Sequence, residues 1–401
     1  MSYQVLVLNS GSSSIKFSLF DEQKTELNLL FNGQVSNLGI EARFSVKGLN
    51  VNEKRGLPDV NDHQSALNNI LDWLKPKLNQ SKELMIGHRV VHGGTKFSSP
   101  VIVDEAILVE LKKLEMLAPL HQHYNLAAIE ELMHVDSSIM QVACFDTAFH
   151  ANHSKLNNQF ALPNSYYEEG VRRYGFHGLS YEYIAHTLKE TDRLLAEGKV
   201  IVAHLGNGSS LCALDQCQSI DSSMGCSALD GLMMGTRCGS IDAGVILYLL
   251  EEKKMSAQEI SDLLYKKSGL LGVSEITNNM DVLLQSSEST AKQAIELYVN
   301  SIVREVGSLM TALKGLDGLV FTAGIGENAA EIRRLVCEQL TWLGIELNKK
   351  ANQDNETLIS SEDSAITVYV IPTNEELMIA QHALDTLSNE KYISLNLKTG
   401  N

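Results

Sequence analysis

The sequence predicts an α/β protein made of two duplicated domains. An apolar strand, a Gly/Ser turn and a second strand occur at residues 5–20, and the same plan returns at residues 200–215. When Gly11 is aligned with Gly208, two consecutive serines and the apolar strands on both sides coincide. A repeated strand–turn–strand unit indicates a duplicated domain, with one copy opening each half of the chain. The alternative interpretation is a chance match of two Gly/Ser hairpins.

The other predicted elements alternate between strand and helix. Runs rich in β-forming residues and bounded by turns predict strands at residues 200–205, 318–324 and 366–372. Residues 291–313 carry apolar side chains at helical spacing, namely Ile295, Tyr298, Val299, Ile302, Val306, Leu309, Met310 and Leu313. Because strands and helices alternate, we expect helices packed on sheets, with a ligand site in the cleft between the two domains.

Length, charge and cysteine usage narrow the class of protein. The chain of 401 residues is long enough for two domains with separate cores, and its net charge of −16 argues against nucleic acid and anionic membranes as partners. No apolar run approaches the length of a membrane span, and Met1 to Val7 lack the basic start of a secretion signal. Six scattered cysteines without a C-x-x-C pair are typical of reduced thiols. We therefore expect a cytoplasmic protein.

Three glycine-rich segments are candidates for holding phosphate, because glycine lets several backbone N–H donors approach one anion. They lie at residues 9–14, with Lys16 just beyond, at residues 204–209 and at residues 324–328. We interpret the last segment as a turn that joins a buried strand to a following helix. It lacks the patterns of Rossmann and Walker sites. Taken singly, each segment has the alternative interpretation of an ordinary turn.

Motifs along almost the full length resemble those of the acetate kinases. The motifs are VLVLNSGSSSIKF (5–17), GHRVVHGG (87–94), APLH (118–121), CFDTAFH (144–150), RRYGFHG (172–178), HLGNGSS (204–210), GLMMGTR (231–237), FTAGIGENAAEIR (321–333) and IPTNEELMIA (371–380). This family belongs to the superfamily of actin, heat-shock chaperones and sugar kinases, whose members have two duplicated ribonuclease H-like domains with ATP in the cleft between them. The resemblance implies an acyl- and phosphate-binding domain at residues 1–149 plus 375–401. It implies a nucleotide-binding domain at residues 150–374.

The resemblance assigns three residues to a carboxylate substrate. Arg89 matches the arginine that holds the substrate carboxylate, and a guanidinium fork suits that group. Val91 is typical of the acetate enzymes, and His121 ends the 118–121 motif. The alternative for Arg89 is a surface ion pair, which its apolar neighbours in sequence disfavour.

Asp146, His177 and Arg237 are the catalytic residues that the resemblance implies. Arg237 and His177 match residues that stabilise the transferring phosphoryl group, and this chemistry needs neutralisation of charge on three equatorial oxygens. Asp146 matches a residue often assigned to proton transfer. Because a carboxylate nucleophile is already ionised at neutral pH, we interpret Asp146 instead as orienting an arginine or a magnesium-bound water.

The resemblance also implies ATP or ADP as co-substrate and Mg²⁺ as metal, with Mn²⁺ as a substitute. Asn9 and Glu375 match the magnesium-associated positions. For Glu375 the alternative is stabilisation of a helix start, because it follows Asn374 where a helix is expected to begin. The implied nucleotide contacts are Lys16, His204, Leu205, Gly206, Asn207, Gly208, Gly324, Ile325, Gly326, Glu327 and Asn328.

These implied roles predict a reversible acetate kinase that transfers the γ-phosphoryl group of ATP directly to acetate, giving acetyl phosphate and ADP. Small molecules are its expected partners, and the family implies a homodimer. One alternative is a propionate or butyrate kinase with a different acyl pocket. Another is a chaperone-like or filament module of the same superfamily, which has no need of a carboxylate-binding arginine. A third is a catalytically inactive relative.

The chain departs from the family pattern at several positions. Gln122 stands where the family usually has asparagine, Tyr181 stands where a second histidine is usual, and Ser240 replaces an acidic residue. The family's Asp-x-Arg nucleotide contact is not legible at residues 276–281, which leaves the adenine-side contacts open. Ala228, where proline is common, is expected to widen the acyl pocket.

Overall fold

The structure is a computed structural model that describes residues 2–24, 26–118 and 121–399, with side chains described as far as residue 388. The predicted 118–121 motif is therefore described only in part, because residues 119–120 lie outside these ranges.

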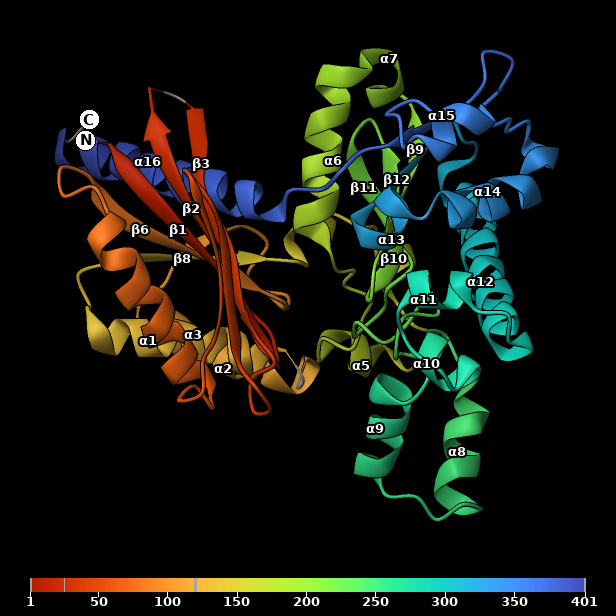
Figure 1. The fold of residues 1–401 in the computed structure, drawn as a ribbon, viewed down its shortest axis with the longest axis horizontal. Helices are drawn as coiled ribbons and strands as arrows, with labels where there is room; N and C mark the ends of the chain where they lie inside the picture. Colours follow the sequence, from red (N-terminus) through yellow and green to blue (C-terminus); the bar gives the residue numbers. More distant parts are fainter. Residues whose placement is uncertain (1, 25, 119–120, 400–401) are drawn as a thin grey trace. The chain divides into compact units, whose positions relative to one another are not determined.

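The chain forms two compact units (Figure 1). The N-terminal unit ends at Ala148 and resumes at Asn374, and the central unit comprises Phe149–Thr373. The domain boundaries predicted from the sequence lie one residue further along the chain in both places.

The N-terminal unit is built on one mixed sheet of eight strands in the order β5-β4-β3-β2-β1-β6-β8-β7. The strands are β1 (Tyr3–Ser10), β2 (Ser14–Gln23), β3 (Glu26–Ser36), β4 (Arg43–Gly48), β5 (Val51–Gly56), β6 (Glu83–Val90), β7 (Val101–Ile102) and β8 (Met140–Phe145). The helices are α1 (His63–Leu74), α2 (Glu105–Lys112), α3 (Gln122–Val135) and α16 (Glu375–Thr399). Strands β1, β6 and β8 run parallel, whereas β1 to β5 follow one another in antiparallel pairs.

Helices lie on both faces of this sheet because successive residues of a strand point to opposite sides. Ile86 of β6 belongs to a buried cluster with Leu67 of α1 and Leu132 of α3. The next residue, Gly87, faces α16, where an added Cβ would lie 2.6 Å from Cγ2 of Ile379. The absence of a side chain at Gly87 therefore lets α16 lie directly along the parallel strands (Figure 1).

The central unit is built on a sheet of five strands in the order β11-β10-β9-β12-β13. The strands are β9 (Lys199–Leu205), β10 (Ser209–Asp215), β11 (Gln218–Ser222), β12 (Gly318–Thr322) and β13 (Thr367–Val370). The helices are α4 (Lys155–Asn158), α5 (Asn164–Glu168), α6 (Gly178–Thr191), α7 (Arg193–Ala196), α8 (Ala243–Glu251), α9 (Ala257–Lys266), α10 (Gly269–Ser274), α11 (Met280–Gln285), α12 (Ser289–Leu313), α13 (Ala323–Asn328), α14 (Ala330–Gln339) and α15 (Lys349–Gln353).

The core of the central unit has two parts, one on each face of its sheet. Ile201 and Ala203 of β9 pack in a cluster with α12 and α14, whereas Val200 and Val202 pack in another with α6 and α7. Figure 1 shows α6 and α12 on opposite sides of β9 and β12. The unit is thus a three-layer α/β/α arrangement.

The predicted duplication is confirmed by the topology of the two sheets. In each unit a hairpin opens the sheet, a third strand adds to its second strand in antiparallel pairing, and two later strands add in parallel beside its first strand. The resulting orders are β3-β2-β1-β6-β8 and β11-β10-β9-β12-β13. The α/β fold class is therefore as predicted, with the hairpins at residues 5–20 and 200–215 in equivalent places.

Three further predictions can be compared with the described residues. The helix predicted at residues 291–313 is α12, which ends at Leu313 and buries its apolar stripe. All six cysteines are free, four of them buried. Among the helices described, none is both long enough and apolar enough to cross a membrane.

The prediction of a glycine-rich turn at residues 324–328 is wrong, because these residues form helix α13. The chain turns sharply at Ala323, which has a left-handed φ of 64°, and enters the helix at once. Two glycines disfavour a helix locally. The fully buried Arg333 offsets this cost, since its Nη1 donates to the carbonyl oxygens of Gly326 and Glu327, both at 2.9 Å, near the helix end.

Two buried histidines make the stability of the central unit depend on pH. Nδ1 of His150 and Nε2 of His153 each lie 2.7 Å from the hydroxyl oxygen of Ser219. Burial lowers the pKa of His150 to about 3, with a further contribution from His153, and burial lowers the pKa of His153 to about 4. The unfolded chain therefore binds more protons than the folded chain below its ordinary histidine pKa of about 6.5. Stability that is present above about pH 6.5 is lost as the pH falls toward the pKa values of the two imidazoles in the folded protein.

We expect the free energy of unfolding of the central unit to fall by roughly 2 kcal/mol for each of the two imidazoles between about pH 7.5 and about pH 5. Urea titrations followed by circular dichroism at several pH values measure this change. His153→Gln should remove about half of the pH dependence. His123→Gln, at an exposed side chain, should leave it intact. An unfolding midpoint that stays constant over this range would contradict the prediction.

Candidate active site

Three of the predicted site residues lie at the carboxyl ends of neighbouring parallel strands of the N-terminal unit. Asn9 is near the end of β1, Arg89 is near the end of β6, and Asp146 directly follows β8. Strand β6 pairs in parallel with β1 on one side and with β8 on the other. Because parallel neighbours end at the same edge of a sheet, residues far apart in the chain are brought together here. This edge is where open α/β sheets bind ligands.

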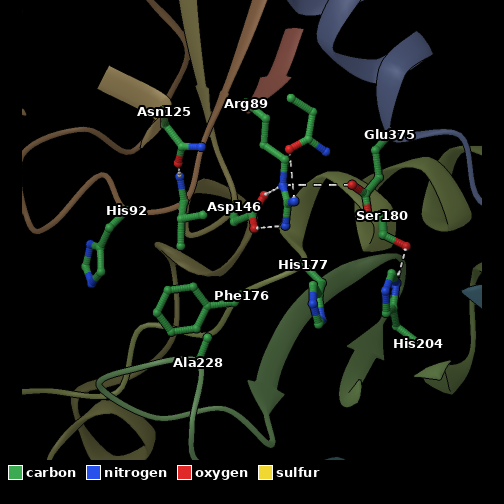
Figure 2. Close-up of polar contacts among 12 residues, drawn as sticks. Arg89, His92, Asn125, Asp146, Phe176, His177, Ser180, His204, Ala228 and Glu375 are labelled. Carbon is green, nitrogen blue, oxygen red and sulfur yellow. Dashed lines mark hydrogen bonds and ion pairs between the residues drawn. The ribbon is translucent and has the colours of Figure 1, made fainter. Parts of the chain in front are cut away.

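The guanidinium of Arg89 forms a two-pronged ion pair with the carboxylate of Asp146 (Figure 2). Its Nε donates to Oδ1 at 2.9 Å and its Nη2 donates to Oδ2 at 2.6 Å, while Nη1 reaches Oδ1 of Asn9 at 3.4 Å. Burial by itself lowers the pKa of Arg89, but the facing carboxylates of Asp146 and Glu375 outweigh it and raise that pKa. This contact is the one that Asp146 needs to orient Arg89, one of the two roles inferred for it from the sequence.

Glu375, the first residue of α16, brings a second carboxylate to Arg89 (Figure 2). Its Oε2 lies 3.9 Å from Nε of Arg89. The start of α16 is capped by Asn374, whose Oδ1 accepts a hydrogen bond of 3.0 Å from a backbone N–H of the first turn. Burial raises the pKa of Glu375 to about 7, with Arg89 opposing this shift and Asp146 adding to it. The side chain of Glu375 thus faces Arg89, while Asn374 caps the helix.

The oxygen donors beside Arg89 fit a magnesium ion that is also held by phosphates. Asn9 offers an amide oxygen and Glu375 a carboxylate, and Mg²⁺ prefers such oxygens while it keeps several waters. No group of three or more His, Cys, Asp or Glu side chains that could hold a metal by themselves occurs among the described residues. A sparse pair of protein ligands is what a metal bound mainly through a nucleotide requires.

Two amide side chains of α3 hold the segment that follows Arg89. Asn125 accepts a hydrogen bond of 3.1 Å from the N–H of Val91 and donates one of 2.6 Å to the carbonyl oxygen of Ser10. Gln122 accepts from the N–H of His92 and donates to its carbonyl oxygen, both at 3.0 Å. Asn125 thus ties the ends of β1 and β6 together. Asn125 was not among the residues predicted from the sequence, although its place just after the 118–121 motif was an available signal.

The other predicted residues of the N-terminal unit lie near the same strand ends. Val91 is buried directly after β6, and His121 is half-buried just before α3. Lys16 lies opposite Asn9 in the β1–β2 hairpin and is exposed. Of the predicted nucleotide contacts, Lys16 belongs to the N-terminal unit, whereas all the others belong to the central unit.

In the central unit, His177 precedes α6 in a left-handed conformation with a φ of 57°. Its Nδ1 lies 2.8 Å from Oγ of Ser210, and that oxygen lies 2.5 Å from the hydroxyl of Tyr181. Its ring stacks on the ring of His204, with centroids 4.1 Å apart. Nδ1 of His204 in turn lies 2.8 Å from Oγ of Ser180 (Figure 2). Side chains from α6, β9 and β10 therefore fix the plane of the His177 imidazole.

The other nitrogen of His177 lies with Arg237 at the turn between β9 and β10. A Cβ added to Gly208 would lie 3.4 Å from Nε2 of His177 and 3.7 Å from Nη1 of Arg237. The same Nη1 donates a hydrogen bond of 2.8 Å to the carbonyl oxygen of Ala228. An imidazole and a guanidinium thus flank a glycine-rich backbone turn. This is an arrangement suited to an anion with several oxygens.

Two of the three glycine-rich segments lie side by side. The turn at residues 206–208 follows β9, and α13 follows β12, its parallel neighbour. A Cβ added to Gly206 would lie 3.9 Å from Cβ of Ala323. His204 and Leu205, which were grouped with this turn in the sequence analysis, are buried residues of β9 itself.

Residues 276–281, in which the family's Asp-x-Arg motif cannot be recognised, also contact this turn. Nδ2 of Asn278 donates to Oδ1 of Asn207 at 2.9 Å. The next residue, Asn279, caps α11 through its side-chain oxygen. Asn278 is therefore a candidate site residue that could not be predicted from the sequence, because no motif marks it.

Comparisons with known proteins show the family of this chain. A model described as the Acetokinase family matches residues 4–381. A curated acetate kinase of Rhodopseudomonas palustris (strain TIE-1) is 50% identical over 389 residues, which cover 95% of this chain and 98% of that protein. A curated acetate kinase of Rickettsia felis is 44% identical over 386 residues, covering 96% and 99%.

Solved structures give the same result. The crystal structure of a propionate kinase from Francisella tularensis subsp. tularensis SCHU S4 has a TM-score of 0.89 at 37% identity, covering 96% of this chain and 99% of that one. The crystal structure of Porphyromonas gingivalis acetate kinase has a TM-score of 0.86 at 36% identity, covering 96% and 100%. The chain therefore belongs to the acetokinase family.

Proposed function

We propose that this protein is an acetate kinase that transfers the γ-phosphoryl group of ATP to acetate by direct in-line displacement, reversibly, giving acetyl phosphate and ADP. The observation that carries the proposal is the identity of 50% with a curated acetate kinase over 98% of that protein's length. The side-chain clusters of the two units support it, because each has the chemistry that one half of the reaction needs.

The cluster around Arg89 suits the carboxylate substrate. Asp146 occupies the Nε side of the guanidinium, and Nη1 has only a long contact of 3.4 Å to Asn9. The Nη1 side is therefore the part of Arg89 that we assign to acetate. Acetate is ionised at neutral pH, so its oxygen attacks phosphorus without a general base. The task of Asp146 is then to hold Arg89. We assign the acyl pocket to Val91, which directly follows β6, and to His121, which precedes helix α3.

His177 and Arg237 suit the phosphoryl group. Phosphoryl transfer depends on positioning and on neutralising charge that spreads over the equatorial oxygens. Both side chains lie within 4 Å of the Cβ position of Gly208, at 3.4 and 3.7 Å. The turn at residues 206–208 and helix α13, with Gly324, Ile325, Gly326, Glu327 and Asn328, are the proposed contacts for the nucleotide, together with Lys16.

Asn9 and Glu375 are the residues that would hold a magnesium ion, and Mn²⁺ fits the same oxygen donors. When bound, the metal would neutralise negative charge on the nucleotide phosphates. Glu375 must be ionised for this role. Arg89, 3.9 Å away, favours that form.

We also propose that the protein is a homodimer in the cytoplasm. The six free cysteines suit a reducing compartment. Helix α8 contains seven apolar residues among nine, yet none of its residues is buried, and Leu247 and Tyr248 are about half exposed. A helix that is apolar on several sides and that the described residues leave largely uncovered suits contact with a second copy.

Leu247→Glu is expected to shift the protein from dimer to monomer in sedimentation experiments, because it places a charge within this apolar surface. Leu194→Glu is the matched control, since Leu194 is exposed on α7 and should leave the mass unchanged. A wild-type protein that sediments as a monomer would refute the dimer proposal.

A hydroxamate assay for acyl phosphate, with ATP and Mg²⁺ and a series of acids from two to four carbons, tests the proposed reaction. Acyl phosphate should form from acetate, and omission of the metal should abolish it. ATP hydrolysis that does not depend on acetate and yields no acyl phosphate would favour a chaperone-like module instead. Absence of both activities would indicate an inactive relative.

A propionate kinase is the second candidate, favoured by the TM-score of 0.89 with a propionate kinase structure. One methylene in an apolar pocket is worth about 1–3 kcal/mol of discrimination. Comparison of kcat/KM for acetate and propionate decides between the two. The small side chain of Ala228 would favour propionate if its methyl group lines the acyl pocket.

A further inference from the structure

Tyr181 has no role in the proposed reaction, yet hydrogen bonds through Ser210 link it to His177. Tyr181 belongs to α6 and is fully buried, as is Ser210 of β10. The phenol oxygen lies 2.5 Å from Oγ of Ser210, and Oγ lies 2.8 Å from Nδ1 of His177. These hydrogen bonds therefore reach the imidazole at Nδ1, whereas the other ring nitrogen, Nε2, lies beside Gly208.

Two features of the central unit beside His177 disfavour a positive charge on its ring. Arg237, a permanent cation, has Nη1 at 3.7 Å from the Cβ position of Gly208, and Nε2 of His177 is 3.4 Å from the same position. His177 also occupies the N-cap of α6, a helix of 14 residues whose dipole is positive at this end. A neutral imidazole carries one proton, and the nitrogen that holds it decides whether Nε2 donates a hydrogen bond or presents a lone pair.

The relative donor strengths of the phenol and the serine hydroxyl decide which ring nitrogen carries that proton. A phenol is more acidic than an aliphatic alcohol and is the better donor, so in the short contact Tyr181 donates to Ser210. Serine has a single hydroxyl proton, which then points along its other contact, toward Nδ1 of His177. Nδ1 accepts this hydrogen bond with its lone pair, and the imidazole proton is therefore on Nε2.

We infer that Tyr181 is a positioning residue that acts through Ser210 to keep the proton of His177 on Nε2, so that the neutral ring donates a hydrogen bond to the transferring phosphoryl group. A lone pair on Nε2 would instead repel the phosphoryl oxygens. The catalytic consequence of this inference rests on the proposed kinase function. The position of the proton on His177 is independent of that function. It concerns this chain in particular, because tyrosine stands here where the family usually has histidine.

Nuclear magnetic resonance of the ring nitrogens tests the position of the proton. Protein labelled with ¹⁵N-histidine gives separate shifts for a nitrogen that carries a proton and for one that accepts a hydrogen bond, and a His177→Gln spectrum identifies the signals of His177. In the wild-type protein we expect Nε2 to be protonated and Nδ1 to be the accepting nitrogen. In Tyr181→Phe and in Ser210→Ala we expect a mixture of both tautomers.

Kinetics test the consequence. Tyr181→Phe should lower kcat by about threefold to tenfold, the effect of one neutral hydrogen bond, with KM for ATP and acetate changed by less than about twofold. Ser210→Ala, which removes the direct partner of His177, should lower kcat at least as much. Tyr183→Phe is the matched control, since Tyr183 lies on the same helix and its hydroxyl forms no hydrogen bond within the described residues.

The outcomes separate this inference from the proposed function. A wild-type His177 protonated on Nδ1 would overturn it, and so would a Tyr181→Phe protein whose tautomer and kcat match those of Tyr183→Phe. A fall in kcat with an unchanged tautomer would also overturn it, because Tyr181 would then act only through packing. If the wild-type protein formed no acyl phosphate, the proposed function would fail, while the spectrum would still report where the proton is.

Discussion

Replacing Arg89 by alanine is expected to lower kcat/KM for acetate by about a thousandfold. The substitution removes the cation that we assign to the substrate carboxylate, and it leaves Asp146, only 2% exposed, without the guanidinium that holds it. Because acetate binding should suffer most, KM for acetate should rise steeply while KM for ATP changes little. Initial rates in the hydroxamate assay over a range of acetate concentrations measure both parameters.

The same substitution should also destabilise the protein, because a buried carboxylate that loses its partner costs about 3–5 kcal/mol. The double substitution Arg89→Met with Asp146→Leu should regain much of this stability, since it removes both charges, but it should regain none of the activity. Arg43→Ala is the matched control, because Arg43 forms an exposed ion pair with Glu41. Unchanged turnover of Arg89→Ala would eliminate the proposed role of Arg89.

Replacing Arg237 by alanine is expected to lower kcat by about a thousandfold or more, the range observed for arginines that stabilise a transferring phosphoryl group. Charge on the equatorial oxygens develops in the transition state, so the loss should appear in kcat, with KM for acetate and for ATP nearly unchanged. This division of effects distinguishes Arg237 from Arg89. Rapid-quench measurement of a single turnover would confirm that the chemical step is the one affected.

Arg237→Lys should recover only a small part of the activity, because an ammonium group lacks the planar fork of a guanidinium. Arg193→Ala, at an exposed ion pair with Glu197, should retain wild-type kinetics. The assignment would be untenable if Arg237→Ala changed KM for acetate alone. Arg237 would then belong with the acyl substrate.

Local patterns predicted the elements whose stability is mostly local. The two Gly/Ser hairpins and the apolar stripe of α12 were readable because a strand repeats every two residues and a helix every three or four. Helix α13 was not readable, since two glycines in its six residues argue against a helix. Two of its carbonyl groups accept hydrogen bonds from Arg333, which lies on the next helix and, among the described residues, is buried without a carboxylate partner. Such a contact is absent from any local pattern.

In the candidate site, too, the sequence predicted some features and only the structure showed others. Resemblance predicted site roles for Arg89, Asp146 and Glu375, but it left two roles open for Asp146 and two for Glu375. The hydrogen bonds of 2.9 and 2.6 Å from Arg89 show what Asp146 holds. The cap formed by Asn374 leaves the carboxylate of Glu375 to face Arg89. Asn125 and Asn278 carry no motif, so their contacts could be found only in three dimensions.

By itself the sequence determined the duplicated α/β plan, the family and the identity of the charged groups, because these depend on residue type and on spacing along the chain. Only the tertiary structure decided which atoms meet. Asp146 contacts Nε and Nη2 of Arg89, and Tyr181 of α6 is linked to the imidazole of His177 through Ser210 of β10. The physical reason is that hydrogen bonds and ion pairs act over about 3 Å. Parallel strands bring residues that are distant in sequence within that range, and no spacing along the chain records the distance.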